Sequence, residues 1–290
     1  MRPLKTWKVV CLVAGLVGGM IGLLPFVTAQ EPAPAYRSPY RIEYHWPRGE
    51  LIGDLEHTER GDHRIEAEIP HALWYAERTR ERWGAWGPPA RFYPAPAEVA
   101  TWSAQRKRER VVAVASRFLG YAYQHHHIPD WDPPAHWHWL PTCAGRNGKG
   151  VDCSNFTGFV YNLGFGLRIN TDVALQARQT EVAGLAGPIA RVDLPATYEE
   201  RLQTLRTGDL LFIRNNAGHV SHVVIWIGSI GASPDGIPLV MDSHGEDTRD
   251  AEGHLIPCGV HLRPFRKNSW YNMSASHAHR LIPEDPASGP

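Results

Sequence analysis

Two stretches of the chain repeat apolar residues at the spacing of an α-helix. In residues 104–121, AQRKRERVVAVASRFLGY, the charged residues come first and the apolar ones then recur with this period. The second stretch is VDCSNFTGFVYNLGFG at 151–166, in which Asp152 suits a helix N-cap and glycine suits the end. We therefore predict an amphipathic helix in the first stretch and a helix that starts at Asp152 in the second.

The C-terminal half contains short runs typical of β-strands. TGDLLFIR, SHVVIWIG and PLVMDSHG are rich in β-branched and aromatic residues and are separated by Gly, Pro, Asn and Asp. HLRPFRK and SASHAHRLI are candidates for two further strands. Helices followed by antiparallel strands indicate an α+β domain.

The first 29 residues have the pattern of a secretory signal peptide. Positive residues precede a long apolar run, and the small residues that end at Ala29 suit cleavage before Gln30. The alternative is an uncleaved membrane anchor, since the apolar run is just long enough to span a bilayer. We expect cleavage, no stable membrane span in the mature chain, and a secreted or periplasmic protein.

The rest of the chain divides into three parts. Residues 30–105 are rich in Pro, Trp and charge, name no function, and are either a targeting module or a wrap around the main domain. Residues 106–283 contain the predicted helices and strands and form the predicted catalytic domain. Residues 284–290 are expected to be a flexible tail.

Composition narrows the class of protein. The 290 residues are 43% hydrophobic and 21% charged, which is typical of a globular protein and excludes a disordered, collagenous or strongly basic chain. The signal peptide holds three of the 30 basic residues and no acidic one, so its removal leaves 27 basic against 30 acidic side chains. This balance argues against a nucleic-acid partner.

Three cysteines remain after the signal peptide, so at least one stays unpaired or pairs between chains in an oxidising compartment. Cys143 and Cys258 either form a disulfide or are two separate thiols. A disulfide between them would leave Cys153 as the reactive thiol.

Cys153 lies in the first turn of the predicted helix. Unpaired N–H groups and the helix dipole favour a thiolate there and suit the oxyanion of a tetrahedral intermediate. The alternative is a small buried hydrophobic residue. His222 lies at the start of the strand SHVVIWIG, at the edge of the core, where it is either a structural residue or a base.

The motifs VDCSNFTGFV, RTGDLLFI and SHVVIWIG resemble, in this order, those of the NlpC-type family of papain-like cysteine peptidases. The resemblance covers about residues 106–283. It implies a papain-like fold in which a helix with the nucleophile packs on an antiparallel β-sheet. It also implies that Cys153 is the nucleophile, that His222 is the base and acid, that the substrates are peptidoglycan stem peptides and that no cofactor is required.

The resemblance assigns three further positions. The third catalytic residue falls in LVMDSHG, where Asp242 and His244 are both candidates and residue type favours His244. Tyr123, with Tyr121 as the rival, corresponds to a tyrosine that donates to the oxyanion or anchors a helix end. Gln176 corresponds to a glutamine near the cleft.

Two departures from the family pattern affect the substrate cleft. Asn155, Val224 and Trp226 add bulk at positions where the family has Gly, Gly and Tyr, so we expect a reshaped cleft with Asn155 as a substrate contact. The loop from 124 to 150 is also unusually long and rich in Pro, His and Trp, and Trp137 and Trp139 are predicted to form a wall of the cleft that stacks on substrate. The histidine pairs 125/127 and 136/138 offer an alternative as zinc ligands, but no accompanying metal motif is present, and no metal site is predicted.

Two other functions stay open. A thiol and an imidazole also perform acyl transfer or amidase chemistry on other amides or lipids, when the thioester is captured by another acceptor. A wall-binding module without catalysis is the third possibility.

Overall fold

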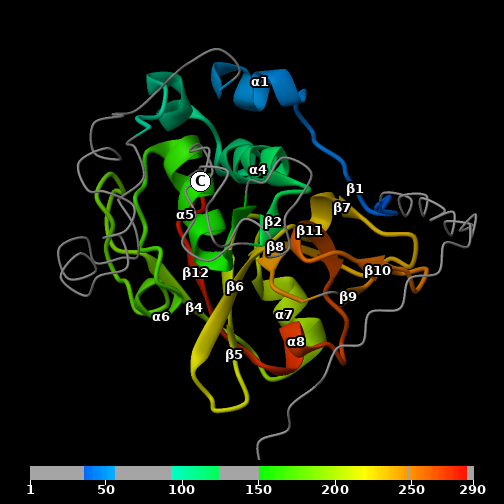
Figure 1. Cartoon of the computed structure of the whole chain (residues 1–290). Coiled ribbons are helices and arrows are strands. Elements are labelled where there is room, and N and C mark those ends of the chain that lie inside the picture. The colour runs from blue at the N-terminus through cyan, green and yellow to red at the C-terminus, as the bar shows by residue number, and fades with distance from the viewer. Residues whose placement is uncertain (1–35, 56–92, 124–149, 247, 286–290) are drawn as a thin grey trace, which may run out of the picture. The chain divides into compact units, whose positions relative to one another are not determined.

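The computed structural model describes residues 36–55, 93–123, 150–246 and 248–285 (Figure 1). The predicted signal peptide, the loop with Trp137 and Trp139, the four candidate zinc-ligand histidines and Cys143 lie outside the described residues. The predictions on them, including the disulfide between Cys143 and Cys258, therefore stay predictions.

A six-stranded antiparallel β-sheet forms the centre of the fold, and its strands are ordered β11-β8-β6-β5-β12-β4 (Figure 1). Their bounds are β4 Ala190–Asp193, β5 Leu210–Arg214, β6 Val220–Trp226, β8 Leu239–His244, β11 Gly259–Pro264 and β12 Ala275–Arg280. All five predicted runs are strands of this sheet. The prediction missed β4, which pairs with β12 at the edge.

Helices cover both faces of the sheet. Their bounds are α1 Arg48–Ile52, α4 Ala104–Ala115, α5 Cys153–Phe165, α6 Val173–Gln176, α7 Tyr198–Thr204 and α8 Trp270–Met273. Short 3-10 helices are η1 Gly53–Leu55, η3 Ala97–Thr101, η4 Ser116–Phe118 and η5 Gly228–Ile230. The predicted helix 104–121 is therefore α4 followed by a 3-10 turn, and the second predicted helix is α5. The α+β class is confirmed.

The alternation of side chains along β6 assigns each helix to a face. Val223 and Ile225 pack in one buried cluster with Phe156 and Phe159 of α5 and with apolar residues of α4. Val224 and Trp226 point to the opposite face, where Leu205, Phe265 and Tyr271 pack against them and α7 and α8 lie. The period-2 pattern of the strand thus separates the two layers of the core.

Helix α5 begins and ends where its sequence dictates. Asp152 is its N-cap, with a side-chain oxygen that accepts a hydrogen bond from the backbone N–H of Asn155. Gly166 ends the helix in the left-handed conformation at φ 69°. Both caps fix the helix so that Cys153 is its first residue.

The described parts of the N-terminal region pack on the same compact unit, which runs from Tyr36. Strand β1 (Arg41–Ile42) pairs with β7 (Gly231–Ala232). Buried Arg110 of α4 donates to both carboxylate oxygens of Asp54, at 2.7 and 2.8 Å, and to the backbone carbonyl of Leu51. These contacts join α1 and η1 to α4.

The C-terminal boundary lies beyond the predicted one. Asp285 accepts a hydrogen bond from the backbone N–H of Ala104 at 2.8 Å, and Glu284 pairs with Arg108 at 3.1 Å. Residues 284 and 285 therefore belong to the folded unit instead of to a tail. None of the helices in the described residues has the length and hydrophobicity to cross a membrane.

Candidate active site

Cys153 lies at the junction between a short β-ladder and α5. Strand β2 (Ala122–Tyr123) runs parallel to β3 (Gly150–Val151), and Asp152 and Cys153 follow directly. The Ser243 hydroxyl on β8 donates to the backbone carbonyl of Val151 at 2.6 Å, which ties this junction to the sheet. Cys153 carries a free thiol and is 6% exposed.

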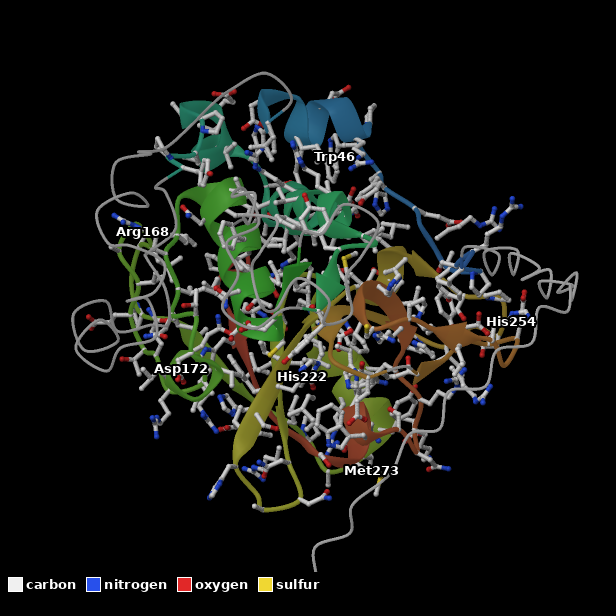
Figure 2. The ribbon with its side chains drawn as sticks, viewed as in Figure 1. Trp46, Arg168, Asp172, His222, His254 and Met273 are labelled. Carbon is white, nitrogen blue, oxygen red and sulfur yellow. The ribbon has the colours of Figure 1, made fainter. Side chains whose placement is uncertain are left out.

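His222 lies on β6 between the beginning of α5 and α8, the helix that carries Met273 (Figure 2). Its Nε2 is 2.6 Å from Oδ2 of Asp242, and Cys153 is near enough for its charge to raise the pKa of the imidazole. Since Asp242 engages Nε2, Nδ1 is the ring nitrogen left for the sulfur. The paired rungs of β6 and β8 are Ile225–Met241 and Trp226–Val240, and His222 and Asp242 lie beyond them.

The charged groups around His222 stabilise one another. Burial acts to lower the pKa of His222, but the charge of Cys153 and the hydrogen bond of Asp242 raise it to about 10. The arrangement therefore favours a positive imidazole at neutral pH. Burial acts to raise the pKa of the Asp242 carboxyl, but the hydrogen bond with His222 and the charge of Arg263 hold it well below its usual range.

Asp242, and not His244, forms the hydrogen bond with His222. His244 lies beside them, with its ring centroid 5.2 Å from that of His222, but its Nδ1 lies within hydrogen-bond distance of the backbone of Glu246. Burial lowers the pKa of His244, so this imidazole is neutral at neutral pH. The preference for His244 rested on residue type. In the structure Asp242, which the register of the small residue had favoured, is the side chain that reaches Nε2.

Asn155 and Gln176 are buried, and their side chains form hydrogen bonds within the protein. Asn155 is 5% exposed, and its side-chain amide donates to Asp152 at 2.9 Å. Gln176 is 1% exposed, donates to the backbone carbonyl of Asn170 at 2.7 Å and accepts from Thr157 at 3.2 Å. Both amides therefore brace the beginning of α5 and the segment before α6, which corrects the prediction that they contact substrate.

Tyr123 lies closer to the site than Tyr121. It is opposite Val151 in the β2–β3 ladder, and its ring lies near Gly245. The ring of Tyr121 packs against Phe118, with centroids 5.3 Å apart, and its backbone exchanges hydrogen bonds with β11 and η4. Tyr123 is thus the tyrosine that borders His244 and the cavity next to it.

A cavity of about 580 Å³ opens beside His222. Tyr123, His222, His244, Trp270 and Tyr271 line one part of it, and the rest is lined by polar and charged residues that include Glu246, Thr248, Arg249 and Arg266. The volume is in the range of small-ligand sites. Sequence reasoning missed α8 and its aromatic pair, although the Trp-Tyr doublet in NSWYNM was a visible signal.

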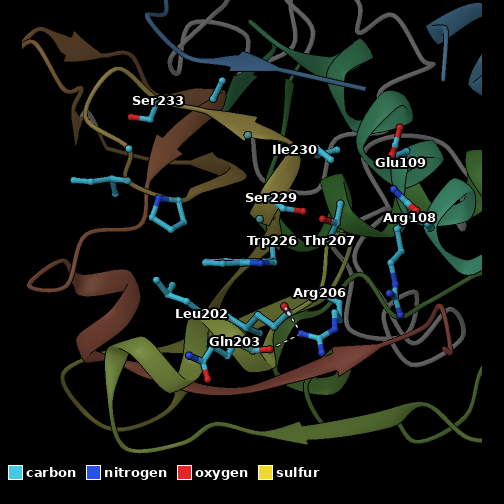
Figure 3. A pocket seen from close by; sticks show the side chains of 18 residues that line it. Arg108, Glu109, Leu202, Gln203, Arg206, Thr207, Trp226, Ser229, Ile230 and Ser233 are labelled. Carbon is cyan, nitrogen blue, oxygen red and sulfur yellow. Dashed lines mark hydrogen bonds between the residues drawn. The ribbon is translucent and has the colours of Figure 1, made fainter. Parts of the chain in front are cut away.

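A larger cavity, of about 710 Å³, lies at the other end of β6 and contains neither Cys153 nor His222 (Figure 3). Trp226 lies in the middle of this view, between Leu202 of α7 and Ser229 of η5. The smaller cavity is therefore the candidate reaction site, because it holds the imidazole.

Sequence reasoning also missed Arg263. Its side chain is fully buried, and its Nε donates to Oδ1 of Asp242 at 2.9 Å. Tyr271 donates its hydroxyl to Oδ2 of the same carboxylate at 2.8 Å. No local signal marked Arg263, because strand alternation groups it with His261, opposite the apolar Val260 and Leu262.

Among the described residues, His222, Asp242 and His244 form a group whose ligand atoms lie within 4.8 Å of one another. A divalent cation fits this group poorly, because Asp242 already accepts from His222, Arg263 and Tyr271. The positive charge of Arg263 also disfavours a second cation at the same carboxylate. The chemistry of the cluster is that of a base and its orienting acid.

Comparison with known proteins addresses the family. The sequence profile of the NlpC/P60 family matches residues 142–239, about a third of the chain, and this segment contains both Cys153 and His222. No curated protein matches the chain. The match agrees with the papain-like arrangement of α5 on the antiparallel sheet. Residues 142–239 are therefore similar to the NlpC/P60 family, and this similarity supports in general a cell-wall peptidase type of function.

Proposed function

We propose that the protein is a secreted or periplasmic cysteine peptidase that hydrolyses peptidoglycan stem peptides through a thioester. One observation carries the proposal: His222 forms a hydrogen bond with Asp242 at 2.6 Å and interacts electrostatically with Cys153, and all three side chains are buried. A nucleophile, a base and a residue that orients the base are the three groups that covalent acyl transfer needs.

The first half of the proposed reaction forms the thioester. The Cys153 thiolate attacks the carbonyl carbon of the scissile amide, and the N–H groups at the beginning of α5 stabilise the oxyanion. The imidazolium of His222 then gives its proton to the amide nitrogen, the C–N bond breaks, and the amine leaves.

The second half releases the acid. His222, now neutral, takes a proton from water, whose oxygen attacks the thioester carbon. The C–S bond breaks, the peptide leaves as a carboxylic acid, and the pair returns to thiolate and imidazolium. Asp242 keeps the ring in place through Nε2 in both halves.

The cavity beside His222 is the proposed substrate site. Trp270 is 36% exposed and lies 5.4 Å from His222 between ring centroids, so it offers an apolar surface next to the base. Arg249 and Arg266 line the same cavity and suit the carboxylates of a stem peptide. The family assignment, which suggests a peptidoglycan-related substrate, supports this choice.

Incubation with purified sacculi or a stem peptide tests the activity. The wild type should release new amino termini, and Cys153→Ala and His222→Ala should not. His219→Ala is the matched control, because His219 is exposed on the turn before β6 and should leave the rate unchanged. Binding of sacculi without cleavage by the wild type would favour a binding module, and transfer of the acyl group to an added amine instead of water would favour an acyltransferase.

The proposed location has its own test. The sequence pattern of residues 1–29 supports export, and cleavage after Ala29 would give a mature chain that begins at Gln30. Fractionation of producing cells followed by N-terminal sequencing checks this. An uncut chain in the membrane fraction would contradict the proposal.

A further inference from the structure

Arg263 is an unusual residue to find next to a candidate active site. Its side chain is 0% exposed, and its guanidinium makes four hydrogen bonds. One goes to Asp242, one to the Thr248 hydroxyl at 2.5 Å, and two to the backbone carbonyls of Pro257 and Gly259 at 2.8 and 3.2 Å. This geometry uses the planar fork of arginine, which lysine cannot reproduce.

Fold stability alone is a weak reason for this arrangement. Burial of two charges costs desolvation energy, and apolar side chains of similar volume often serve a core as well or better. Arg263 extends from β11 to the neighbouring β8, and its partner on β8 is the carboxylate that holds His222. The location of the Arg263–Asp242 pair therefore indicates a role in holding the imidazole of His222.

Tyr271 completes the surroundings of the carboxylate. Its hydroxyl donates to Oδ2, the same oxygen that lies 2.6 Å from Nε2 of His222. The side chain of Tyr271 is buried, and its ring centroid lies 6.2 Å from that of His222. Arg263 and Tyr271, from two different elements, thus each donate to one oxygen of Asp242. Together they fix the orientation of the carboxylate toward His222.

We propose that Arg263 and Tyr271 are positioning residues that hold Asp242 as an oriented carboxylate, so that the proton stays on His222 and the thiolate–imidazolium pair is maintained. The inference rests on the proposed function. It adds two residues, from β11 and α8, that act on the chemistry through Asp242.

The guanidinium also connects Asp242 to the wall of the cavity. Thr248 belongs to β9 (Thr248–Arg249), which pairs with β10 (Leu255–Ile256), and Pro257 follows β10 directly. Thr248 and Arg249 line the cavity beside His222. Arg263 therefore fixes this hairpin and the carboxylate in one network.

The test measures how the rate of Cys153 alkylation depends on pH in three variants. Tyr271→Phe removes only the hydroxyl, Arg263→Met removes the charge at similar volume, and Arg263→Lys keeps the charge without the fork. Alkylation of Cys153 by iodoacetamide, followed by mass mapping from pH 4 to 10, needs no substrate. This readout stays informative even if the protein does not cleave stem peptide, so failure of the inference and failure of the proposed function are distinguishable.

Loss of either donor should narrow the pH range of the ion pair. The acidic limb of Cys153 alkylation should move to higher pH by about one unit, which is the usual effect of one hydrogen bond to a charged group. We expect kcat to fall about tenfold with little change in KM. Arg263→Lys should restore part of the shift seen in Arg263→Met.

Arg280→Met is the matched control. Arg280 pairs with buried Asp209 at 2.7 Å, so its loss should lower Tm without a change in the pH profiles. Profiles of Tyr271→Phe and Arg263→Met that coincide with the wild type would overturn the inference, as would an equal shift in Arg280→Met. If Arg263→Met does not fold, Tyr271→Phe decides, because it preserves the volume of the core.

Discussion

Replacement of Asp242 by Asn tests the electrostatics of the cluster most directly. The substitution keeps the shape of the side chain and removes its charge. Both carboxylate oxygens accept hydrogen bonds, Oδ1 from Arg263 and Oδ2 from Tyr271 and His222. Asparagine offers a single acceptor oxygen, so at least one of these donors would face an NH₂ group.

The size of the expected effect follows from His222 and Arg263, the two positive groups that lose the charge of Asp242. A hydrogen bond to a charged group contributes about 1.5–3 kcal/mol, and one pH unit corresponds to about 1.4 kcal/mol, so the pKa of His222 should fall by roughly one to two units. Arg263 would keep its contacts to Thr248 and two carbonyls but lose its counter-ion. A buried charge without its partner costs about 3–5 kcal/mol, which corresponds to a Tm lower by roughly 10 °C.

The assay pairs thermal unfolding with kcat/KM on a stem peptide as a function of pH. Asp242→Asn should lower Tm and move the alkaline limb to lower pH. The double variant Asp242→Asn/Arg263→Met should recover part of the Tm but none of the activity, since it removes both buried charges. Asp209→Asn breaks the buried pair with Arg280 and serves as the control for stability alone.

A clear result would refute this reasoning. If Asp242→Asn keeps the alkaline limb of the wild type, the carboxylate does not support the charge of His222. If the loss of Tm in the double variant equals the sum of the losses in the two single variants, Asp242 and Arg263 are not coupled energetically. The first result would remove Asp242 from the proposed mechanism, and the second would remove the coupling between Asp242 and Arg263.

Three further predictions follow from the same contacts. His244→Asn should change kcat/KM less than about threefold, against a loss of roughly 100- to 10,000-fold for His222→Ala in the same stem-peptide assay, since His244 forms its hydrogen bonds with the Glu246 backbone. Tm measured against pH should be highest between about pH 5 and 6.5. The lowered pKa of Asp242 gives stability that is lost as pH falls below the ordinary value of about 3.9, and the raised pKa of His222 gives stability that is complete below the ordinary value of about 6.5 and is lost as pH rises from there through about 10. A flat profile would contradict both shifts. Gly166→Ala should cost about 1 kcal/mol in denaturant unfolding because of the φ of 69°, whereas Gly164→Ala, with Val114 at an ordinary 3.6 Å, should cost less.

Periodic segments were predictable from the sequence because local rules decide them. The helix α5 follows from Asp152, the apolar repeat and Gly166, and the strands of the sheet follow from β-branched runs between turn residues. The short helices α6 and α8 contain four residues each, too few for a period to appear. Helix α7 was missed although Thr197 and Glu200 form a capping box, a signal that sequence reasoning can use.

The site was predictable where motifs carry it and not where tertiary contacts do. Cys153 and His222 stand at recognisable positions in a helix start and a strand start. The choice between Asp242 and His244 depends on how β6 and β8 are placed beyond their paired rungs, which no local pattern encodes. Arg263 and Tyr271 reach Asp242 from elements distant in sequence, so their roles appear only once the chain is folded.

The Ser243 hydroxyl on the Val151 carbonyl has a consequence for how this domain tolerates insertions. The backbone just before the nucleophile is fastened to the strand that carries Asp242, and on its other side it pairs with Tyr123. The spacing between sulfur and imidazole is thus set by main-chain anchors at both ends of the segment 124–149. Additions and deletions within that segment would leave the Ser243 anchor and the β2–β3 pairing in place, so the position of the sulfur does not depend on the length of the segment.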